Sequence, residues 1–104
     1  MSKKQILVIG RNQDAMQKVL ELINQHENWI GKGSITDEGA TEMFMNGTFD
    51  LVLLGGGVEV ESGIQLRKTF TEKNPDIYII QHFGSVGTLV SDIEAAFKTE
   101  GHLI

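Results

Sequence analysis

Arg11 and the run Gly55-Gly56-Gly57 are the residues of this 104-residue chain best suited to bind an anion. A guanidinium carries a permanent positive charge, and glycines let main-chain N–H groups approach a phosphate or carboxylate closely. The run fits neither the P-loop nor the dinucleotide-binding pattern. The simpler explanation of the glycines is a tight loop that requires positive φ angles. Both interpretations remain open, a small-anion site or a loop without a ligand.

Other side chains with reactive groups lack the partners that chemistry requires. Glu59 and Glu61 offer carboxylates to a cation, but acidic residues in a loop are usually only hydrated. His82 ends an apolar run where a base or a phosphoacceptor would be useful, yet no nucleophile or orienting residue can be assigned to it. The chain contains no cysteine, which excludes thiolate ligands and nucleophiles. We expect no enzymatic activity, no metal and no cofactor.

The composition indicates one globular domain over residues 1–104. Hydrophobic residues make up 40% of the chain and charged residues 22%, the balance of an ordinary folded domain. The 14 acidic residues outnumber the 9 basic ones, and the net charge of -5 repels the phosphates of nucleic acids. The first apolar run, Ile6–Ile9, is far too short for a signal peptide or a membrane span. We expect a cytoplasmic domain that binds neither nucleic acid nor membranes.

Short apolar runs alternate with helical spacing along the chain. Strands are predicted at residues 5–9, 29–35, 50–54 and 77–80. Between these runs, apolar residues recur at intervals of three and four, and helix starts are predicted at the caps Asn12, Thr36 or Asp37, and Ser62. Strands that are apolar throughout and alternate with helices predict an α/β fold, in which helices cover both faces of a parallel sheet.

Several segments in this order resemble the response-regulator receiver domain. They are Ile6-Leu7-Val8-Ile9, Gly39-Ala40, Phe49-Asp50-Leu51-Val52-Leu53-Leu54, Ser62-Gly63, Asn74-Pro75-Asp76-Ile77 and Ile93-Glu94-Ala95-Ala96. The resemblance implies a flavodoxin-like, three-layer α/β/α fold with strand order 2-1-3-4. The fifth strand of the family has no counterpart here, so we expect it to be truncated or missing.

The residues that give receivers their chemistry are absent from this chain. The acidic pair after the first strand falls on Gly10 and Arg11, and the phosphoacceptor aspartate falls on Gly55. Glycine has no side-chain oxygen with which to hold Mg²⁺ or to attack phosphorus. The hydroxyl residue that ends the fourth strand falls near Phe83. The resemblance is therefore to a shortened, degenerate pseudo-receiver without a phosphoacceptor.

Two functional hypotheses follow from this comparison. The first is a non-catalytic domain of a signalling or two-component pathway that acts through protein–protein contacts with a partner that the sequence does not identify. The alternative is a small-anion or nucleotide sensor that binds at Arg11 and the glycine run Gly55-Gly56-Gly57.

A missing fifth strand would leave the fourth strand at the edge of the sheet. Residues Ile77, Tyr78, Ile79 and Ile80 form an apolar run with no lysine or proline to discourage pairing with another strand. A second copy of the chain is the most available cover for such an edge. We expect a homodimer through these residues and Phe83.

Overall fold

The computed structural model describes residues 3–82 and 86–102, over which strands and helices alternate. The elements are β1 (Lys4–Ile9), α1 (Gln13–Gln25), β2 (Trp29–Ser34), α2 (Asp37–Asn46), β3 (Leu51–Gly55), α3 (Val60–Lys73), β4 (Tyr78–His82) and α4 (Val86–His102). The strands form a parallel sheet in the order β2-β1-β3-β4. This architecture confirms the predicted fold, with β4 at one edge of the four-stranded sheet.

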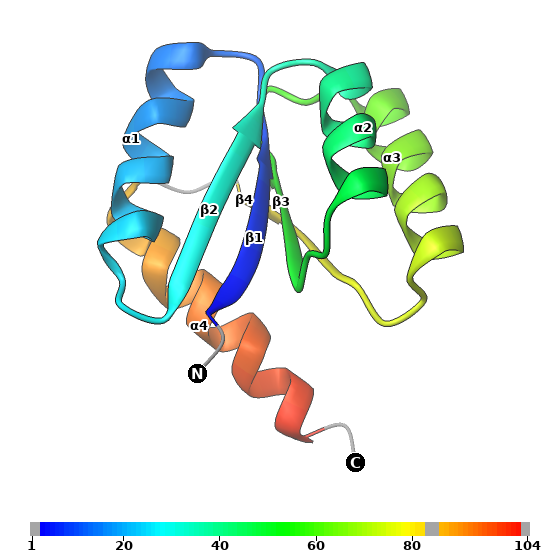
Figure 1. The fold of residues 1–104 in the computed structure, drawn as a ribbon. Coiled ribbons are helices and arrows are strands. Elements are labelled where there is room, and N and C mark those ends of the chain that lie inside the picture. The colour runs from blue at the N-terminus through cyan, green and yellow to red at the C-terminus, as the bar shows by residue number, and fades with distance from the viewer. Residues whose placement is uncertain (1–2, 83–85, 103–104) are drawn as a thin grey trace.

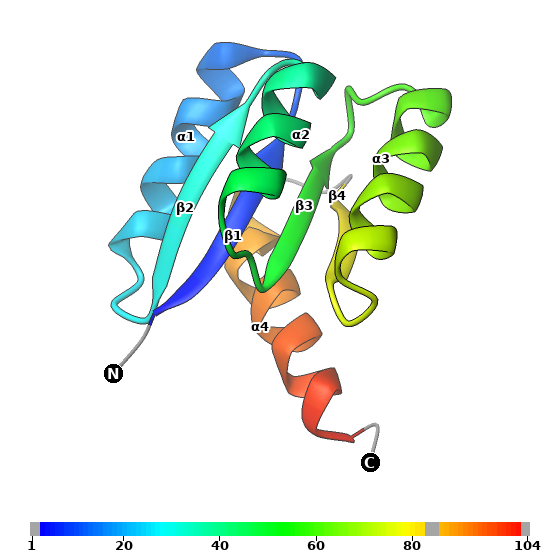
Figure 2. The same ribbon diagram turned by 45° about the vertical axis from the view of Figure 1, so that its right-hand side comes forward.

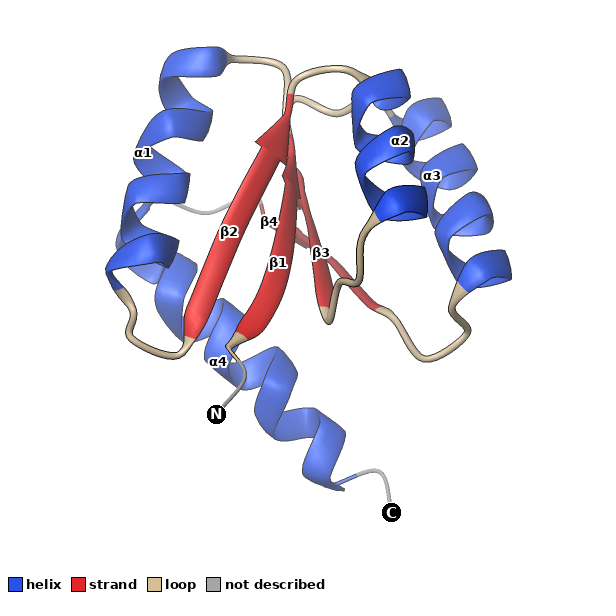
Figure 3. Ribbon diagram, in the orientation of Figure 1, coloured by secondary structure: helices blue, strands red, loops and turns tan. Residues whose placement is uncertain are grey.

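Helices cover both faces of the sheet, so the fold has three layers (Figure 1). Helices α2 and α3 lie side by side on one face, and α1 and α4 lie on the other (Figure 3). Two apolar clusters fill the spaces between the layers. The first joins Leu7 and Val52 to Phe44 and Phe70, and the second contains Ile23.

The two central strands are buried because helices pack on both of their faces. Ile6, Leu7 and Ile9 of β1 are completely inaccessible to solvent. In the register of the parallel pairing, Ile9 of β1 lies opposite Leu54 of β3. The residues that follow these two positions, Gly10 and Gly55, are therefore neighbours at the carboxyl edge of the sheet.

Three helix starts were predicted, and two of them are confirmed. Oδ1 of Asn12 accepts a hydrogen bond from the N–H of Ala15 at 3.0 Å, and Thr36 caps α2 in the same way. The prediction for Ser62 was wrong, because α3 already begins at Val60 after the N-cap residue Glu59. Glu59 makes no side-chain cap, and its carbonyl oxygen accepts from the N–H of Gly63 at 2.9 Å.

The outer strands β2 and β4 lie at the two edges of the sheet (Figure 2). Residues Ile77–Ile80 are half-buried, because their side chains pack against the two apolar clusters while no strand of the described residues pairs with the outer edge of β4. The strand itself runs from Tyr78 to His82, so Ile77 precedes it. Phe83, the last residue of the predicted dimer surface, lies outside the described residues.

Within residues 3–82 and 86–102, no helix combines the length and the apolar character that crossing a membrane requires.

Candidate functional site at the carboxyl edge of the sheet

The fold brings the predicted anion-binding residues together where β1 and β3 end. A Cβ atom added to Gly55 would lie 3.3 Å from the carbonyl oxygen of Ile9 and 3.6 Å from Cα of Gly10. A Cβ atom added to Gly57 would lie 3.7 Å from Cβ of Arg11. The residues that replace the receiver carboxylates are therefore adjacent in space, at the edge where ligands of parallel α/β sheets bind.

The guanidinium of Arg11 is already occupied by groups of the protein. Nη2 donates to Oδ1 of Asp37 at 2.6 Å, and Nε donates to Oε1 of Glu59 at 3.0 Å. Nη1 donates to the carbonyl oxygens of Gly10 and Ile35, both at 3.3 Å. Arg11 thus ties together the three loops that follow β1, β2 and β3.

Charge and hydrogen bonding stabilise the ionised forms of this cluster. The hydrogen bond to Asp37 raises the pKa of Arg11. Partial burial acts to raise the pKa of Asp37, but hydrogen bonds from Arg11 and Ser62 outweigh it and hold that pKa below its ordinary value. The pKa of Glu59 is lowered by a hydrogen bond from its own main-chain N–H and then by Arg11. All three groups are consequently charged at neutral pH.

Sequence reasoning missed Asp37 as the main partner of Arg11. Asp37 was considered only as a helix cap, and Glu59 only as a cation ligand. Both carboxylates instead neutralise the guanidinium, which has four of its five N–H donors engaged by the bonds above. An anion at this edge would have to compete with two carboxylates that are already in place.

A cavity of about 500 Å³ lies between the ends of β1 and β3 and the first turns of α1. Its side-chain lining is mostly apolar and includes Val8, Met16, Val19 and Leu53, and Gly55-Gly56-Gly57 also lines it. No carboxylate lines it, and the described part of the chain contains no group of three His, Asp or Glu side chains placed to hold a metal. The cavity offers a space for an apolar group and no carboxylate ligand for a hard cation.

The glycine loop has a different backbone from the one predicted. Among the described residues no glycine has a positive φ, so Gly55-Gly56-Gly57 does not require glycine for that reason. The close approach of Gly55 to the main chain of β1 is the constraint that the structure does show. The candidate base His82 ends β4, but its side chain lies outside the described part of the structure.

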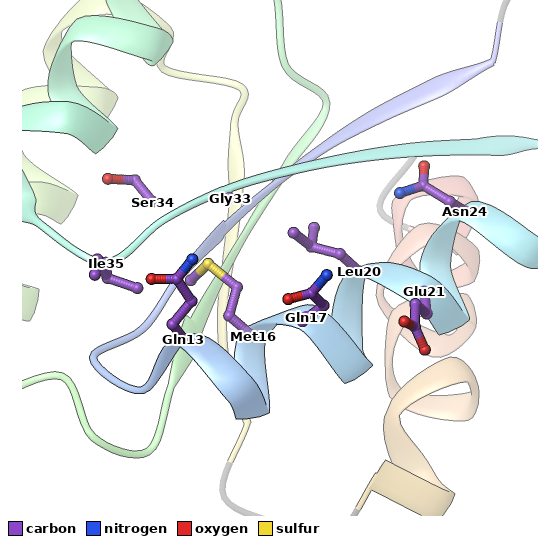
Figure 4. A pocket seen from close by; sticks show the side chains of 9 residues that line it. All are labelled: Gln13, Met16, Gln17, Leu20, Glu21, Asn24, Gly33, Ser34 and Ile35. Carbon is purple, nitrogen blue, oxygen red and sulfur yellow. The ribbon is translucent and has the colours of Figure 1, made fainter.

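A second cavity, of about 620 Å³, runs along the edge of β2 beside α1 (Figure 4). Met16 and Leu20 form its apolar floor next to Gly33, and Gln13 and Gln17 reach over it from α1 (Figure 4). This cavity was not predicted. The only signal for it in the sequence is the pair of glycines, Gly31 and Gly33, within a strand.

Comparison with solved structures supports the receiver-like fold. One match is to a chain of the complex between the histidine kinase ThkA and the response regulator TrrA. It has 26% sequence identity over 79% of this chain and 74% of the matched chain, at a TM-score of 0.63. The non-phosphorylated HemR receiver domain of Leptospira biflexa has 18% identity over 88% of this chain and 75% of that one, at a TM-score of 0.64.

A domain from another system shares this fold. The lactose-specific IIB component domain of the phosphoenolpyruvate:carbohydrate phosphotransferase system of Streptococcus pneumoniae has 17% identity, covers 97% of both chains and gives a TM-score of 0.63. No protein-family model matches the sequence, and no curated protein matches it either. The similarities establish a flavodoxin-like, receiver-like domain, as the sequence predicted.

Proposed function

We propose that this receiver-like domain serves a signalling pathway as a non-catalytic interaction module that accepts no phosphoryl group. The observation that carries the proposal is the position of Arg11, whose guanidinium binds Asp37 and Glu59 beside Gly10 and Gly55. A permanent cation, held by two carboxylates, therefore lies at the place on the sheet edge where a phosphorylatable receiver needs a metal ion and an aspartate.

In a receiver domain, phosphoryl transfer from a small donor requires a nucleophilic carboxylate oxygen and a metal ion that neutralises charge on the transferred group. Gly55 provides no such oxygen, and Gly10 provides no metal ligand. The two nearest carboxylates, on Asp37 and Glu59, are paired with Arg11. A divalent cation would therefore find no carboxylate ligands free and would be repelled by the guanidinium.

The Arg11 contacts also favour a single arrangement of the loops. A ligand shifts a conformational equilibrium only by its difference in affinity for the two states. Because Arg11 already links the loops after β1, β2 and β3, phosphate and metal have no unoccupied charged partner there. The domain then presents a fixed surface to its partner. A protein partner is in keeping with the structural neighbour that was solved as a kinase–regulator complex.

The proposal is tested by incubating the full chain with Mg²⁺ and acetyl phosphate, beside a phosphorylatable receiver as a positive control. Intact-mass measurement should show the phosphoryl adduct in the control and none in this chain. Amide NMR spectra recorded with and without Mg²⁺ should superimpose. A stable phosphoryl adduct on this chain would overturn the proposal.

A small-anion or nucleotide sensor is the second candidate, favoured by the cavity that opens beside Arg11 and Gly55-Gly56-Gly57. Such a ligand must displace Asp37 or Glu59 from the guanidinium. A thermal-shift screen against phosphates and nucleotides should then give a stabilisation that disappears in Arg11→Ala. The absence of any shift across the screen would leave the interaction module as the function.

A further inference from the structure

The two edges of the sheet differ in how their main chain is protected. At the β2 edge, Oδ1 of Asn24 accepts from the N–H of Gly31 at 2.9 Å, and its Nδ2 donates to the carbonyl oxygen of Gly31 at 3.4 Å. Figure 4 shows the Asn24 side chain extending from α1 toward this strand. Nη1 of Arg11 donates a hydrogen bond to the carbonyl oxygen of Ile35, just beyond the strand. These side chains block the addition of another strand beside β2.

At the β4 edge, Ile79, Ile80 and Gln81 have no such protection among the residues that the structure describes. No side chain there hydrogen-bonds the main chain of Ile79, Ile80 or Gln81, whose inner side pairs with β3. An edge strand leaves N–H and C=O groups of alternate residues unpaired and is therefore a template for a further strand. Tyr78–Gln81 also lacks the lysine or proline that commonly discourages such pairing.

An exposed apolar pair lies on the helix that covers this same edge. Val60 and Ile64 are one turn apart on α3, and they are 78% and 61% exposed. Gln65 and Thr69 line the groove between α3 and α2, so Val60 and Ile64 occupy the opposite flank of the helix. That flank faces away from α2 and toward the β4 edge, because α3 packs over β3 and β4 at the end of the sheet (Figure 2).

We propose that the outer edge of β4 and the Val60–Ile64 flank of α3 form one interface with a second copy of this chain. This inference rests on the proposed function, because it identifies one surface and one partner of the proposed interaction module. In a two-fold dimer the two β4 strands would run antiparallel and join two sheets into one. Strands about 4.8 Å apart would place the two α3 axes at about 10 Å, the spacing of packed helices.

Charges on α3 favour a second copy in this antiparallel arrangement. Glu61 and Lys68 are exposed two turns apart on α3, and helical spacing makes them the i−3 and i+4 neighbours of Ile64. When two α3 helices pack antiparallel about Ile64, Glu61 of each copy lies close to Lys68 of the other. The two-fold symmetry produces this Glu61–Lys68 attraction twice. Two α3 helices packed in parallel would instead place Glu61 beside Glu61 and Lys68 beside Lys68.

The test compares the oligomeric state of the full chain with that of two charge variants. Ile64→Lys places a cation in the proposed interface. Met45→Lys is the matched control, because Met45 is a 43% exposed apolar residue on α2, away from β4. Sedimentation equilibrium should show a dimer for the native chain and for Met45→Lys, and a dissociation constant at least about tenfold higher for Ile64→Lys. Circular dichroism establishes that each variant is folded.

A second variant addresses the strand independently of the helix. Gln81→Lys adds a charge to the exposed part of β4 and should also weaken the dimer. Zero-length carboxylate–amine cross-linking of mixed ¹⁴N and ¹⁵N chains should couple Glu61 to Lys68 between copies. A native chain that remains monomeric at millimolar concentration overturns the interface, as does a dimer insensitive to both Ile64→Lys and Gln81→Lys. The acetyl phosphate experiment is independent of these results, so each proposal can fail alone.

Discussion

Ile23 of α1 and Gly31 of β2 approach each other so closely that only a hydrogen atom fits on Cα of the glycine. A Cβ atom at Gly31 would lie 2.8 Å from Cγ2 of Ile23, which belongs to a stiff β-branched side chain. At Gly33 the corresponding atom would lie 2.6 Å from Sδ of Met16. The two glycines therefore let α1 lie directly on the edge strand, and this contact brings Asn24 within reach of Gly31.

Gly31→Ala should consequently lower the free energy of unfolding by about 1–3 kcal/mol, as overpacking of a filled space does. Urea denaturation followed by circular dichroism measures the change. Gly57→Ala is the control, because its added Cβ would meet Cβ of Arg11 at an ordinary 3.7 Å. We expect Gly57→Ala to leave stability unchanged or slightly increased. Equal losses in the two variants would contradict the close-approach explanation.

The sequence was sufficient to predict the central strands. β1 and β3 are covered by helices on both faces, so burial demands unbroken apolar runs, and such runs are visible without a structure. β2 was harder to identify, because Gly31 and Gly33 weaken the strand pattern. The two glycines are needed because α1 contacts β2 closely at these positions. Such a contact between two elements leaves no periodic pattern in the sequence of either element.

The site could be predicted only in part, for a similar reason. Gly10 and Gly55 end neighbouring strands, so strand order alone places them together. The partners of Arg11 lie 26 and 48 residues away, on other loops, and the choice among the many exposed acidic residues depends on side-chain conformation. Ser62 resembled a helix cap, yet α3 begins earlier, and Ser62 instead helps to lower the pKa of Asp37.

Arg11→Gln should lower the free energy of unfolding at pH 7. The loss expected from the Asp37 contact is about 1 kcal/mol, because the Asp37 side chain is 37% exposed and solvent screens the pair. Thermal or urea unfolding of both proteins provides the measurement. Arg67→Gln is the control, since Arg67 is an exposed arginine on α3. If Arg67→Gln costs as much as Arg11→Gln, the paired guanidinium is not the cause.

The stability difference between the native chain and Arg11→Gln should depend on pH. The pKa values of Asp37 and Glu59 in the fold lie below their ordinary values of 3.8 and 4.5. Each contribution is therefore fully present above the ordinary pKa and is lost as pH falls through the lowered one. Unfolding curves of the two proteins should differ at pH 6 to 7 and converge at acid pH, where both carboxylates become protonated in the fold. A difference that persists unchanged at acid pH would contradict the carboxylate pairing.

Lys73 of α3 closes the carboxyl end of α2. Its Nζ donates to the carbonyl oxygens of Phe44 at 2.6 Å and Met45 at 2.8 Å, groups that lack partners within their own helix. Lys73→Met keeps the apolar stem and removes the donors, and it should lower stability by about 1–2 kcal/mol. Lys18→Met, on an exposed position of α1, should change stability little. Similar effects for both variants would rule out a specific role for Lys73.

Asn24→Ala should expose the main chain of the β2 edge. Without the Asn24 amide, the N–H and C=O groups of Gly31 are left to solvent or to another strand. We expect a loss of about 1 kcal/mol in stability and an increase in concentration-dependent association, because an unprotected edge recruits strands. Gln17→Ala, on the same helix, is the control. Light scattering during incubation should rise for Asn24→Ala and stay at the native level for Gln17→Ala. If Ile64→Lys is added to Asn24→Ala, association through β2 should persist while the β4 dimer is lost, which would separate the two edges experimentally.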